Sequence, residues 1–144
     1  MRTKTEFSAL LDGFVDAVAN KDYDRAVLWC DTPCTIVRPT GAQLFDQPSA
    51  AAQDLRECWE CYYDSGICDL RYTILDKRSY TEGVTLVDID WELLDHRGHV
   101  PITFQSTYGM RRVADTLKIM FILGHNEIFQ RPHRAEAKPG HHSY

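Results

Sequence analysis

The sequence predicts an α+β domain in which three N-terminal helices pack in the concave face of a strongly curved, mostly antiparallel sheet. Two observations carry this prediction. Apolar residues recur at helical spacing in the first half of the chain, and the second half changes to long strand-like segments joined by short turns. Helices followed by a run of strands are typical of the α+β class. One face of such a sheet needs burial, so the helices must cover it.

The three predicted helices each have a start signal or an apolar face. The first spans about residues 4–19, and its apolar side consists of Phe7, Leu10, Leu11, Phe14, Val15 and Val18. A short second helix follows, from an N-cap at Asp22 through Cys30, and it ends before Pro33. The third begins at Pro48, and Ser65-Gly66 ends it. Its apolar face consists of Ala51, Leu55, Cys58, Trp59 and Tyr62.

One short strand and four long strands are predicted. The short strand covers residues 34–39 and is followed by a turn at Gly41, and the long strands cover 67–79, 82–95, 100–113 and 116–129. Their short connections imply consecutive antiparallel hairpins, because parallel pairing needs long crossovers. Strands this long should bend or carry bulges, with Gly109 and Gly124 as candidate positions. Residues 1–130 form the single predicted domain, and 131–144 a loosely ordered tail.

Composition and charge limit the classes of partner. The chain has 144 residues, of which 44% are hydrophobic, and a formal net charge of −5. An acidic surface repels polyphosphate, so nucleic acid and anionic membranes are not expected partners. No apolar run approaches the roughly 20 residues that a membrane helix needs. The N-terminal residues lack the apolar stretch of a secretory signal, so a cytoplasmic location is expected.

The five cysteines are expected to be reduced and free of metal: Cys30, Cys34, Cys58, Cys61 and Cys68. The Cys58-x-x-Cys61 spacing invites a redox or zinc interpretation. We do not favour it, because the pair lies within a predicted helix and has no second Cys/His pair at finger-like spacing. Buried thiols that behave as small apolar side chains explain these residues better. No cofactor is expected.

Four short sequence segments, and the order in which they occur, resemble those of the nuclear transport factor 2-like superfamily and its SnoaL-like branch. They are FVDAVANKD (residues 14–22), CTIVRP (34–39) before Gly41, WELLDHRG (91–98) and STYGMRR (106–112). The resemblance covers roughly residues 5–129 and implies a cone-shaped fold with a pocket at its open end. The superfamily contains isomerases, dehydratases, dioxygenase small subunits and binding proteins, so the fold does not choose a function.

The resemblance also permits one test against steroid isomerases. In those enzymes the short strand carries an aspartate general base, and the matching position here is Arg38. A guanidinium stays protonated and cannot act as that base. The tyrosine that donates to the oxyanion from the first helix corresponds to Phe14. Both departures argue against a steroid isomerase.

Strand alternation predicts which side chains face the pocket. Trp91, Tyr108 and His125 each fall in phase with the apolar residues of their strands, so we expect them to point inward. A bulge would turn the residues beyond it to the other face, which affects His125 most. A histidine and a tyrosine in an aromatic cavity could form an acid/base pair, with His125 moving the proton and Tyr108 as the electrophile. The alternative for both is a hydrogen-bonded core residue.

Six further residues are candidates for substrate binding. A flat apolar ligand would contact Trp59, Tyr62, Trp91, Met110 and Phe121, and Arg38 could clamp a carboxylate. A plain aromatic core and a solvated arginine are the alternatives. Three carboxylates at i, i+2 spacing, Asp88, Asp90 and Glu92, more simply mark the polar outer face of the sheet than a metal site.

Three functions therefore stay open. The first is a cofactor-independent lyase or isomerase acting on an apolar cyclic substrate. The second is a non-catalytic ligand-binding domain with the same cavity, and the third a structural subunit like the dioxygenase small subunits. The superfamily commonly pairs through its sheet, and we expect Met120 and Ile122 on the outer face. We therefore predict a homodimer.

Overall fold

The computed structural model describes residues 5–81 and 83–125. Its helices are α1 (Glu6–Ala19), α2 (Tyr23–Ala26), the short 3-10 helix η1 (Val27–Trp29) and α3 (Pro48–Asp64). Its strands are β1 (Cys30–Arg38), β2 (Gly41–Phe45), β3 (Ile67–Thr81), β4 (Val84–Asp95), β5 (Ile102–Val113) and β6 (Thr116–Gly124). The predicted tail from residue 131 onward lies outside the described residues.

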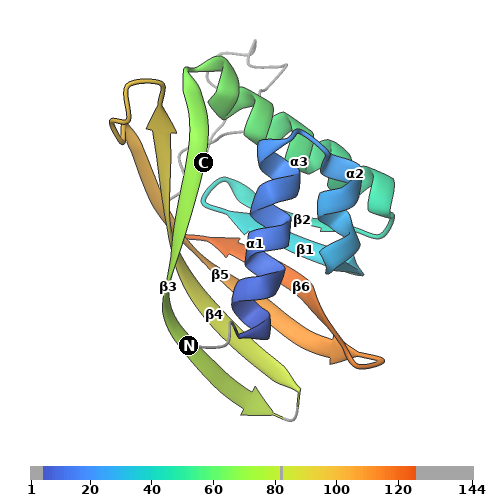
Figure 1. The fold of residues 1–144 in the computed structure, drawn as a ribbon. Helices are drawn as coiled ribbons and strands as arrows, with labels where there is room; N and C mark the ends of the chain where they lie inside the picture. Colours follow the sequence, from blue (N-terminus) through green and yellow to red (C-terminus); the bar gives the residue numbers. More distant parts are fainter. Residues whose placement is uncertain (1–4, 82, 126–144) are drawn as a thin grey trace.

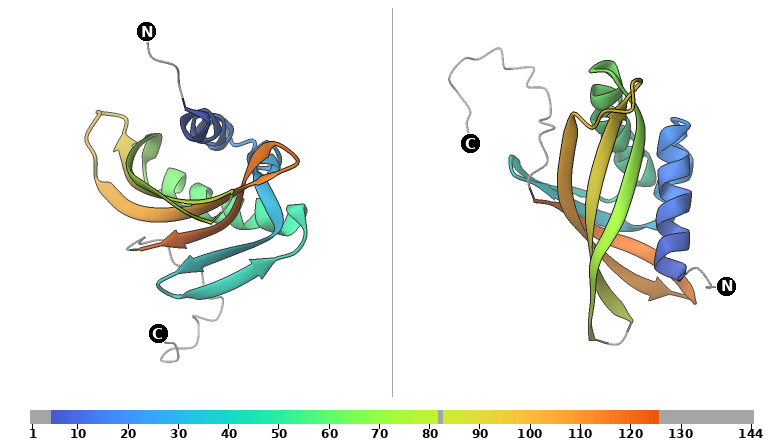
Figure 2. Two further views of the ribbon diagram at one scale, coloured as in Figure 1. Left: turned by 90° about the horizontal axis from the view of Figure 1, so that it is seen from below. Right: turned by 60° about the vertical axis from the view of Figure 1, so that its left-hand side comes forward.

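The strands form one curled sheet with the helices on one side of it (Figures 1 and 2). The strand order is β2-β1-β6-β5-β4-β3, and all neighbours are antiparallel except β1 and β6, which are parallel. The predicted α+β class and the predicted antiparallel run of four long strands are confirmed. β6 ends at Gly124, and the rest of the predicted strand 116–129 reaches beyond the described residues.

The N-terminal half differs from the prediction at two places. The second helix ends at Ala26 and continues as η1, so Cys30 begins a strand rather than ending a helix. The predicted single strand 34–39 is a hairpin of β1 and β2, and β1 also pairs with β6. The β1–β6 pair joins segments about 85 residues apart, and a partner that distant leaves no periodic signal in the local sequence.

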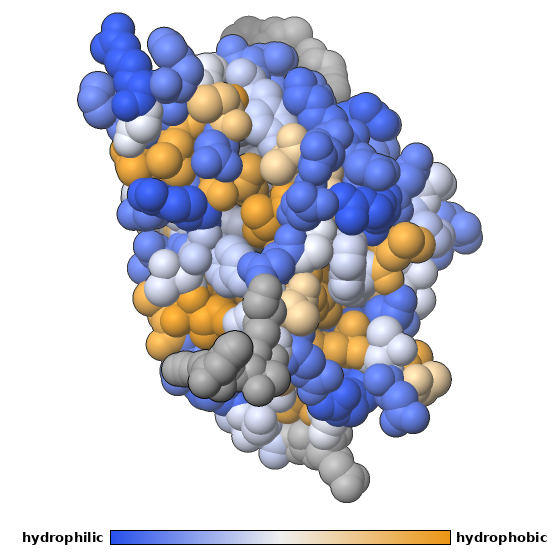
Figure 3. All heavy atoms as spheres, in the orientation of Figure 1, coloured by the Kyte–Doolittle hydropathy of each residue, from blue (hydrophilic) through white to orange (hydrophobic). Residues whose placement is uncertain are grey.

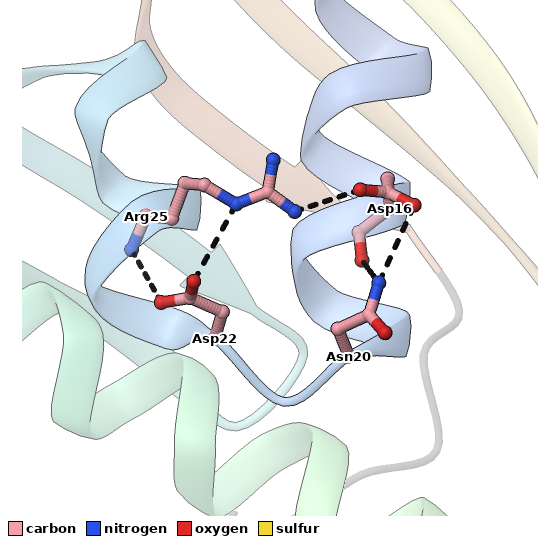
Figure 4. A network of polar contacts seen from close by, with 4 residues as sticks. All are labelled: Asp16, Asn20, Asp22 and Arg25. Carbon is pink, nitrogen blue, oxygen red and sulfur yellow. Dashed lines mark hydrogen bonds and ion pairs between the residues drawn. The ribbon is translucent and has the colours of Figure 1, made fainter.

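The helix starts follow the capping chemistry that their sequences suggest. Thr5 accepts a hydrogen bond from the Ser8 backbone N–H, and Asp22 accepts one from that of Arg25. Figure 4 shows how the junction of α1 and α2 is tied together: Arg25 Nη2 donates to Asp16 at 2.7 Å, and Asn20 Nδ2 donates to the Asp16 carbonyl at 2.8 Å. The polar network holds the two helices in place above the sheet.

Three tyrosine hydroxyls connect the helices to each other and to the sheet. Tyr63 of α3 donates to the Val18 carbonyl of α1 at 2.9 Å, and Tyr23 of α2 donates to Glu60 of α3 at 3.0 Å. Tyr72 of β3 donates to Asp12 of α1 at 2.5 Å. Burial, together with the Asp12 hydrogen bond, raises the pKa of Tyr72 to about 12. The helix layer is therefore fixed to the sheet by directional bonds as well as by packing.

The core lies between the helices and the concave face of the sheet. Its fully buried side chains include Leu11, Phe14, Val18, Tyr23, Val87, Ile89, Trp91, Leu93, Met110 and Ile119. Apolar surface on the helical side of the molecule is divided into separate patches by hydrophilic residues (Figure 3). Within the described residues, no helix has both the length and the apolar character needed to cross a membrane.

Candidate functional site

A small cavity lies between α3 and the concave face of the sheet. Its volume is about 30 Å³, and none of its lining residues is more than 8% exposed. The lining residues come from five elements: Ile36, Arg38, Leu55, Cys58, Trp59, Trp91, Phe104, Ser106, Tyr108 and Ile122. A cavity needs only about 10–15 Å³ to hold a water molecule, so this space suits one or two water-sized groups.

A buried ion pair stands at the wall of this cavity. Arg38 donates to both carboxylate oxygens of Asp54, at 3.2 Å from Nη1 and 2.9 Å from Nη2, and the two side chains are 8% and 1% exposed. Two parallel bonds between a guanidinium and a carboxylate are the strong, geometrically specific form of this contact. The alternative of a solvated Arg38 is therefore wrong. A carboxylate clamp also loses its basis, because Asp54 already balances the charge.

Local periodicity positions both members of the pair. In β1, alternation points Cys34, Ile36 and Arg38 to the helix side. In α3, Asp54 lies three residues after Ala51 and four before Cys58, on the buried face. Asp54 was not among the residues predicted from the sequence. The sequence pattern that could have identified it is a carboxylate in phase with the apolar face of a helix. A carboxylate at such a position predicts a buried cationic partner.

An aromatic cluster centred on Trp91 forms the rest of the wall. Its ring lies 6.0 Å from that of Trp59, 6.2 Å from Phe104 and 6.2 Å from Tyr108, measured between centroids. The indole Nε1–H donates to Ser106 Oγ at 2.8 Å, so the polar atom of the tryptophan is satisfied within the core. Ser106 is a polar lining residue that was not among the candidates predicted from the sequence.

The structure brings some of the candidate residues together and separates others. Trp59, Trp91, Arg38 and Tyr108 line the cavity. Tyr62 and Met110 are buried but do not line it, and Tyr62 stacks on Phe104 at 5.9 Å. Tyr108 also packs edge-to-face against Phe14 of α1 at 6.1 Å.

The predicted inward orientation of His125 and Phe121 is wrong, because β6 contains a bulge. Met110 pairs with Ile119 but Gly109 pairs with Phe121, so residue 120 is an extra residue in β6. Beyond it the two faces exchange. Ile122, expected outside, lines the cavity, and the Phe121 ring covers Gly109 on the outer face. An acid/base role for His125 in the cavity has no geometric basis.

His125 belongs instead to a polar chain on the outer face. Thr107 Oγ1 donates to Asp88 at 2.6 Å and lies 2.7 Å from His125 Nε2. A hydroxyl has one proton, so the Nε2–H of His125 donates to Thr107. Arg78 Nη2 contacts both Asp88 oxygens at 2.9 Å. Thr107 is only 4% exposed. These hydrogen bonds and ion pairs therefore connect β3, β4 and β5 and have a structural role.

The cavity offers hydrogen-bond donors and little net charge. The charges of Arg38 and Asp54 cancel, and the remaining polar lining groups include a thiol and two hydroxyls, on Cys58, Ser106 and Tyr108. In the described part of the chain, no histidine and no carboxylate lines the cavity. Residues 5–81 and 83–125 also contain no group of three or more His, Cys, Asp or Glu side chains able to hold a metal ion.

The family model described as "NTF2-like protein (DUF6841)" matches residues 3–127. The chain belongs to this NTF2-like family. None of the curated proteins matches the chain. The narrower placement of this NTF2-like protein in the SnoaL-like branch stays a prediction.

Solved structures with the same fold have little sequence identity to this NTF2-like protein. An NTF-2 like protein of unknown function from Shewanella oneidensis MR-1 has a TM-score of 0.64 at 16% identity, over 83% of this chain and 95% of that one. A domain with a cystatin-like fold from Nostoc punctiforme PCC 73102 has 0.67 at 11%, over 88% and 81%. A ketosteroid isomerase-like protein from Erwinia carotovora atroseptica SCRI1043 has 0.59 at 14%, over 85% and 93%. At this identity they show the fold alone.

Proposed function

We propose that the cavity binds a small, neutral, largely apolar molecule that carries one oxygen acceptor such as a carbonyl group. The observation that carries the proposal is the buried Arg38–Asp54 pair, whose arginine lines a cavity with a mostly apolar and aromatic wall. The guanidinium of Arg38 can donate hydrogen bonds to a ligand, while Asp54 neutralises its charge. Pockets that combine an apolar lining with a few placed polar groups are typical small-molecule sites.

Electrostatics favours a neutral oxygen over a carboxylate. An anion beside Arg38 would share the guanidinium with Asp54 and leave one negative charge uncompensated in a buried site, which is costly. A carbonyl oxygen accepts a hydrogen bond from Arg38, Ser106 or Tyr108 without that cost.

The size of the cavity limits how a ligand binds. A space of about 30 Å³ holds the carbonyl end of a molecule but not a ring. The ring of a cyclic ligand must therefore displace side chains of α3, where Leu55, Cys58 and Trp59 form the cavity wall. We expect weak binding of small probes, accompanied by shifts in this helix.

The three tryptophans give a direct test. Trp59 and Trp91 line the cavity, whereas Trp29 packs over Gly13 of α1 away from it. Titration with cyclopentanone, followed through the indole N–H resonances of the ¹⁵N-labelled protein, should shift the signals of Trp59 and Trp91 and leave that of Trp29 unchanged. Equal shifts of all three, or no shift at millimolar probe, would refute the proposal.

Matched ligands and variants separate specific from non-specific binding. Methylenecyclopentane lacks the oxygen and should bind less tightly, and cyclopentanecarboxylate should not bind. Cys58→Met fills the cavity and should abolish the shifts, whereas Cys61→Met, on the exposed side of the same helix, should preserve them. Binding of the carboxylate with an affinity equal to that of the ketone would contradict the electrostatic argument.

A cofactor-independent isomerase or lyase is the second candidate, and the position of Tyr108 favours it. A buried tyrosine hydroxyl in a cavity wall can stabilise a developing oxyanion, and the Erwinia structure of similar fold is described as ketosteroid isomerase-like. In such an enzyme Tyr108 would stabilise the enolate while a base from the solvent takes the α-proton of cyclopentanone. The α-protons would then exchange with deuterated water faster than in buffer alone, and Tyr108→Phe would remove the excess rate. Exchange equal to the buffer rate leaves ligand binding as the function.

Assembly remains a separate prediction. A homodimer through the sheet, and the alternative of a structural subunit, both place another chain on the outer face. Light scattering at tens of micromolar tests the first, and a monomer mass would reject it. A subunit of a larger complex should instead be unstable or aggregate when purified alone.

A further inference from the structure

Strand β1 contains a large bulge with a cysteine on each side of it. Cys30 pairs with Ile119 of β6, and the parallel register resumes where Thr35 pairs with Phe121. β1 therefore advances five residues while β6 advances two, which leaves three surplus residues in β1. This bulge lies between Cys30 and Cys34, two of the five free thiols.

The bulge brings the two thiols together. In an extended strand, residues four apart are separated by about 13 Å. Here the Cys30 and Cys34 side chains are hydrogen-bonded to each other. The contact is local to this pair, whereas Cys58 and Cys61, which share the C-x-x-C spacing, lie on the buried and exposed sides of α3.

Polar contacts hold the start of the bulge to the sheet. Lys118 of β6 donates to the Leu28 carbonyl at 2.6 Å, just before Cys30. Arg111 of β5 contacts Asp31 from Nη2 at 2.8 Å and from Nε at 3.1 Å. The segment is therefore anchored on each side of Cys30, so the thiol pair can react without release of β1 from the sheet.

We propose that Cys30 and Cys34 form a redox site that closes to an intrachain disulfide on exposure to a low-molecular-weight disulfide. The geometry divides the two roles. Cys30 is half-buried and can be reached by a small reagent, whereas Cys34 is 1% exposed and is reached only from Cys30. Cys30 is thus the entry thiol and Cys34 the resolving thiol.

The electrostatic environment of the two thiols sets the pH at which the entry step runs. The hydrogen bond from Cys30 lowers the pKa of Cys34, while burial and the nearby carboxylates of Asp31 and Asp54 oppose that effect. The same hydrogen bond and burial raise the pKa of Cys30, and Lys118 opposes them. Only the thiolate of Cys30 attacks the reagent, so the entry step is slow at neutral pH and becomes faster as the pH rises.

The reaction has two thiol–disulfide exchanges. The Cys30 sulfur, after losing its proton, attacks one sulfur of the reagent and displaces the other as a thiolate, which leaves a mixed disulfide on Cys30. Cys34 then attacks the Cys30 sulfur and releases the second reagent thiolate. Two protein thiols lose two protons and two electrons in total, and one reagent disulfide is reduced to two thiols.

The site has a direct connection to the cavity. Cys34 is followed, on the same face of β1, by Ile36 and Arg38, which both line the cavity. Closing the disulfide would hold Cys34 in place at the start of the inward-facing residues of β1. It would also remove a titratable thiol near Asp54. The redox proposal itself does not depend on ligand binding, because its test measures the thiols alone.

The test uses the full chain carrying Cys61→Ser and Cys68→Ser, which removes the two exposed thiols and leaves the pair intact. After treatment with oxidised glutathione, we expect the protein to lose two hydrogen atoms, to carry no glutathione and to keep one thiol, at Cys58. Proteolysis without reduction should give a peptide containing a Cys30–Cys34 disulfide.

Single variants test the order of the two steps. In the same background, Cys34→Ala should retain one glutathione on Cys30, whereas Cys30→Ala should leave Cys34 unmodified. Stable glutathione on Cys30 in the background with both thiols, a disulfide that includes Cys58, or no reaction of the native protein would each overturn the proposal.

Discussion

Two arginine–aspartate pairs lie on opposite faces of the same sheet, and they differ mainly in their exposure to water. Arg38 and Asp54, on the inner face, are 8% and 1% exposed. Arg78 and Asp88, on the outer face, are 41% and 23% exposed. The shortest N–O distance is 2.9 Å in both. The shortest contact is therefore equally close in the two pairs, although Arg38 uses two nitrogens and Arg78 one, and the two pairs differ strongly in exposure.

The difference shows why a short distance between charges is a poor measure of stability. Water solvates the outer pair in the folded and unfolded states alike, so its net contribution is small. The inner pair has lost its hydration, and each charge depends on the other. Removing one inner partner should therefore be far more damaging than removing one outer partner.

The largest expected effect comes from breaking the inner pair. Asp54→Ala should lower the free energy of unfolding by about 3–5 kcal/mol, because it leaves the Arg38 charge buried and uncompensated. Urea denaturation measures this. The double variant Arg38→Met with Asp54→Leu removes both charges and should recover most of the loss. A cost below about 1 kcal/mol for Asp54→Ala would show that water reaches the inner pair, and the comparison would fail.

Truncating the aromatic centre of the inner face should have a similar cost. Trp91 is 1% exposed, so Trp91→Ala should lower stability by about 3–5 kcal/mol through lost burial and a residual cavity. Tyr80→Ala is the matched control, because Tyr80 is 65% exposed and its loss should change stability by no more than about 0.5 kcal/mol. Equal effects of the two variants would contradict the assignment of Trp91 to the core.

On the outer face of the sheet, substitution of Gly109 should also lower the stability of the protein. A Cβ atom at Gly109 would collide with the Phe121 ring, so Gly109→Ala should cost about 1–3 kcal/mol by overpacking. Thr103→Ala, at an exposed position on the same face of β5, is the control and should be nearly neutral. A neutral Gly109→Ala would indicate that Phe121 does not cover this position and that the β6 bulge is misplaced.

The smallest effect is expected from the outer pair. Asp88→Asn should lower stability by about 0.2–1 kcal/mol, and the difference from the native protein should shrink in about 1 M salt. His125→Gln, at the end of the same polar chain, should change stability by no more than about 0.5 kcal/mol and leave cyclopentanone binding unaltered. A loss of ligand binding in His125→Gln would contradict the outer position of this histidine.

Local patterns in the sequence were sufficient to predict most of the elements. The helical spacing around Phe14 and the cap at Asp22 correspond to α1 and α2, and the short turns separate the four long strands. The inward phase of Trp91 and Tyr108 followed from alternation within β4 and β5, where the register is continuous as far as Gly109. These features depend on residues close together in the chain, so the sequence by itself determined them.

Tertiary structure alone decided the features that depend on distant segments. The extra residue in β6 turned His125 outward, and the alternation of apolar residues continues across it without a visible break. The pairing of Arg38 with Asp54, and the β1 bulge that joins Cys30 to Cys34, arise from the packing of β1 against β6 and α3. A local period shows that a residue faces the core, but only three-dimensional packing selects the residue that it meets there.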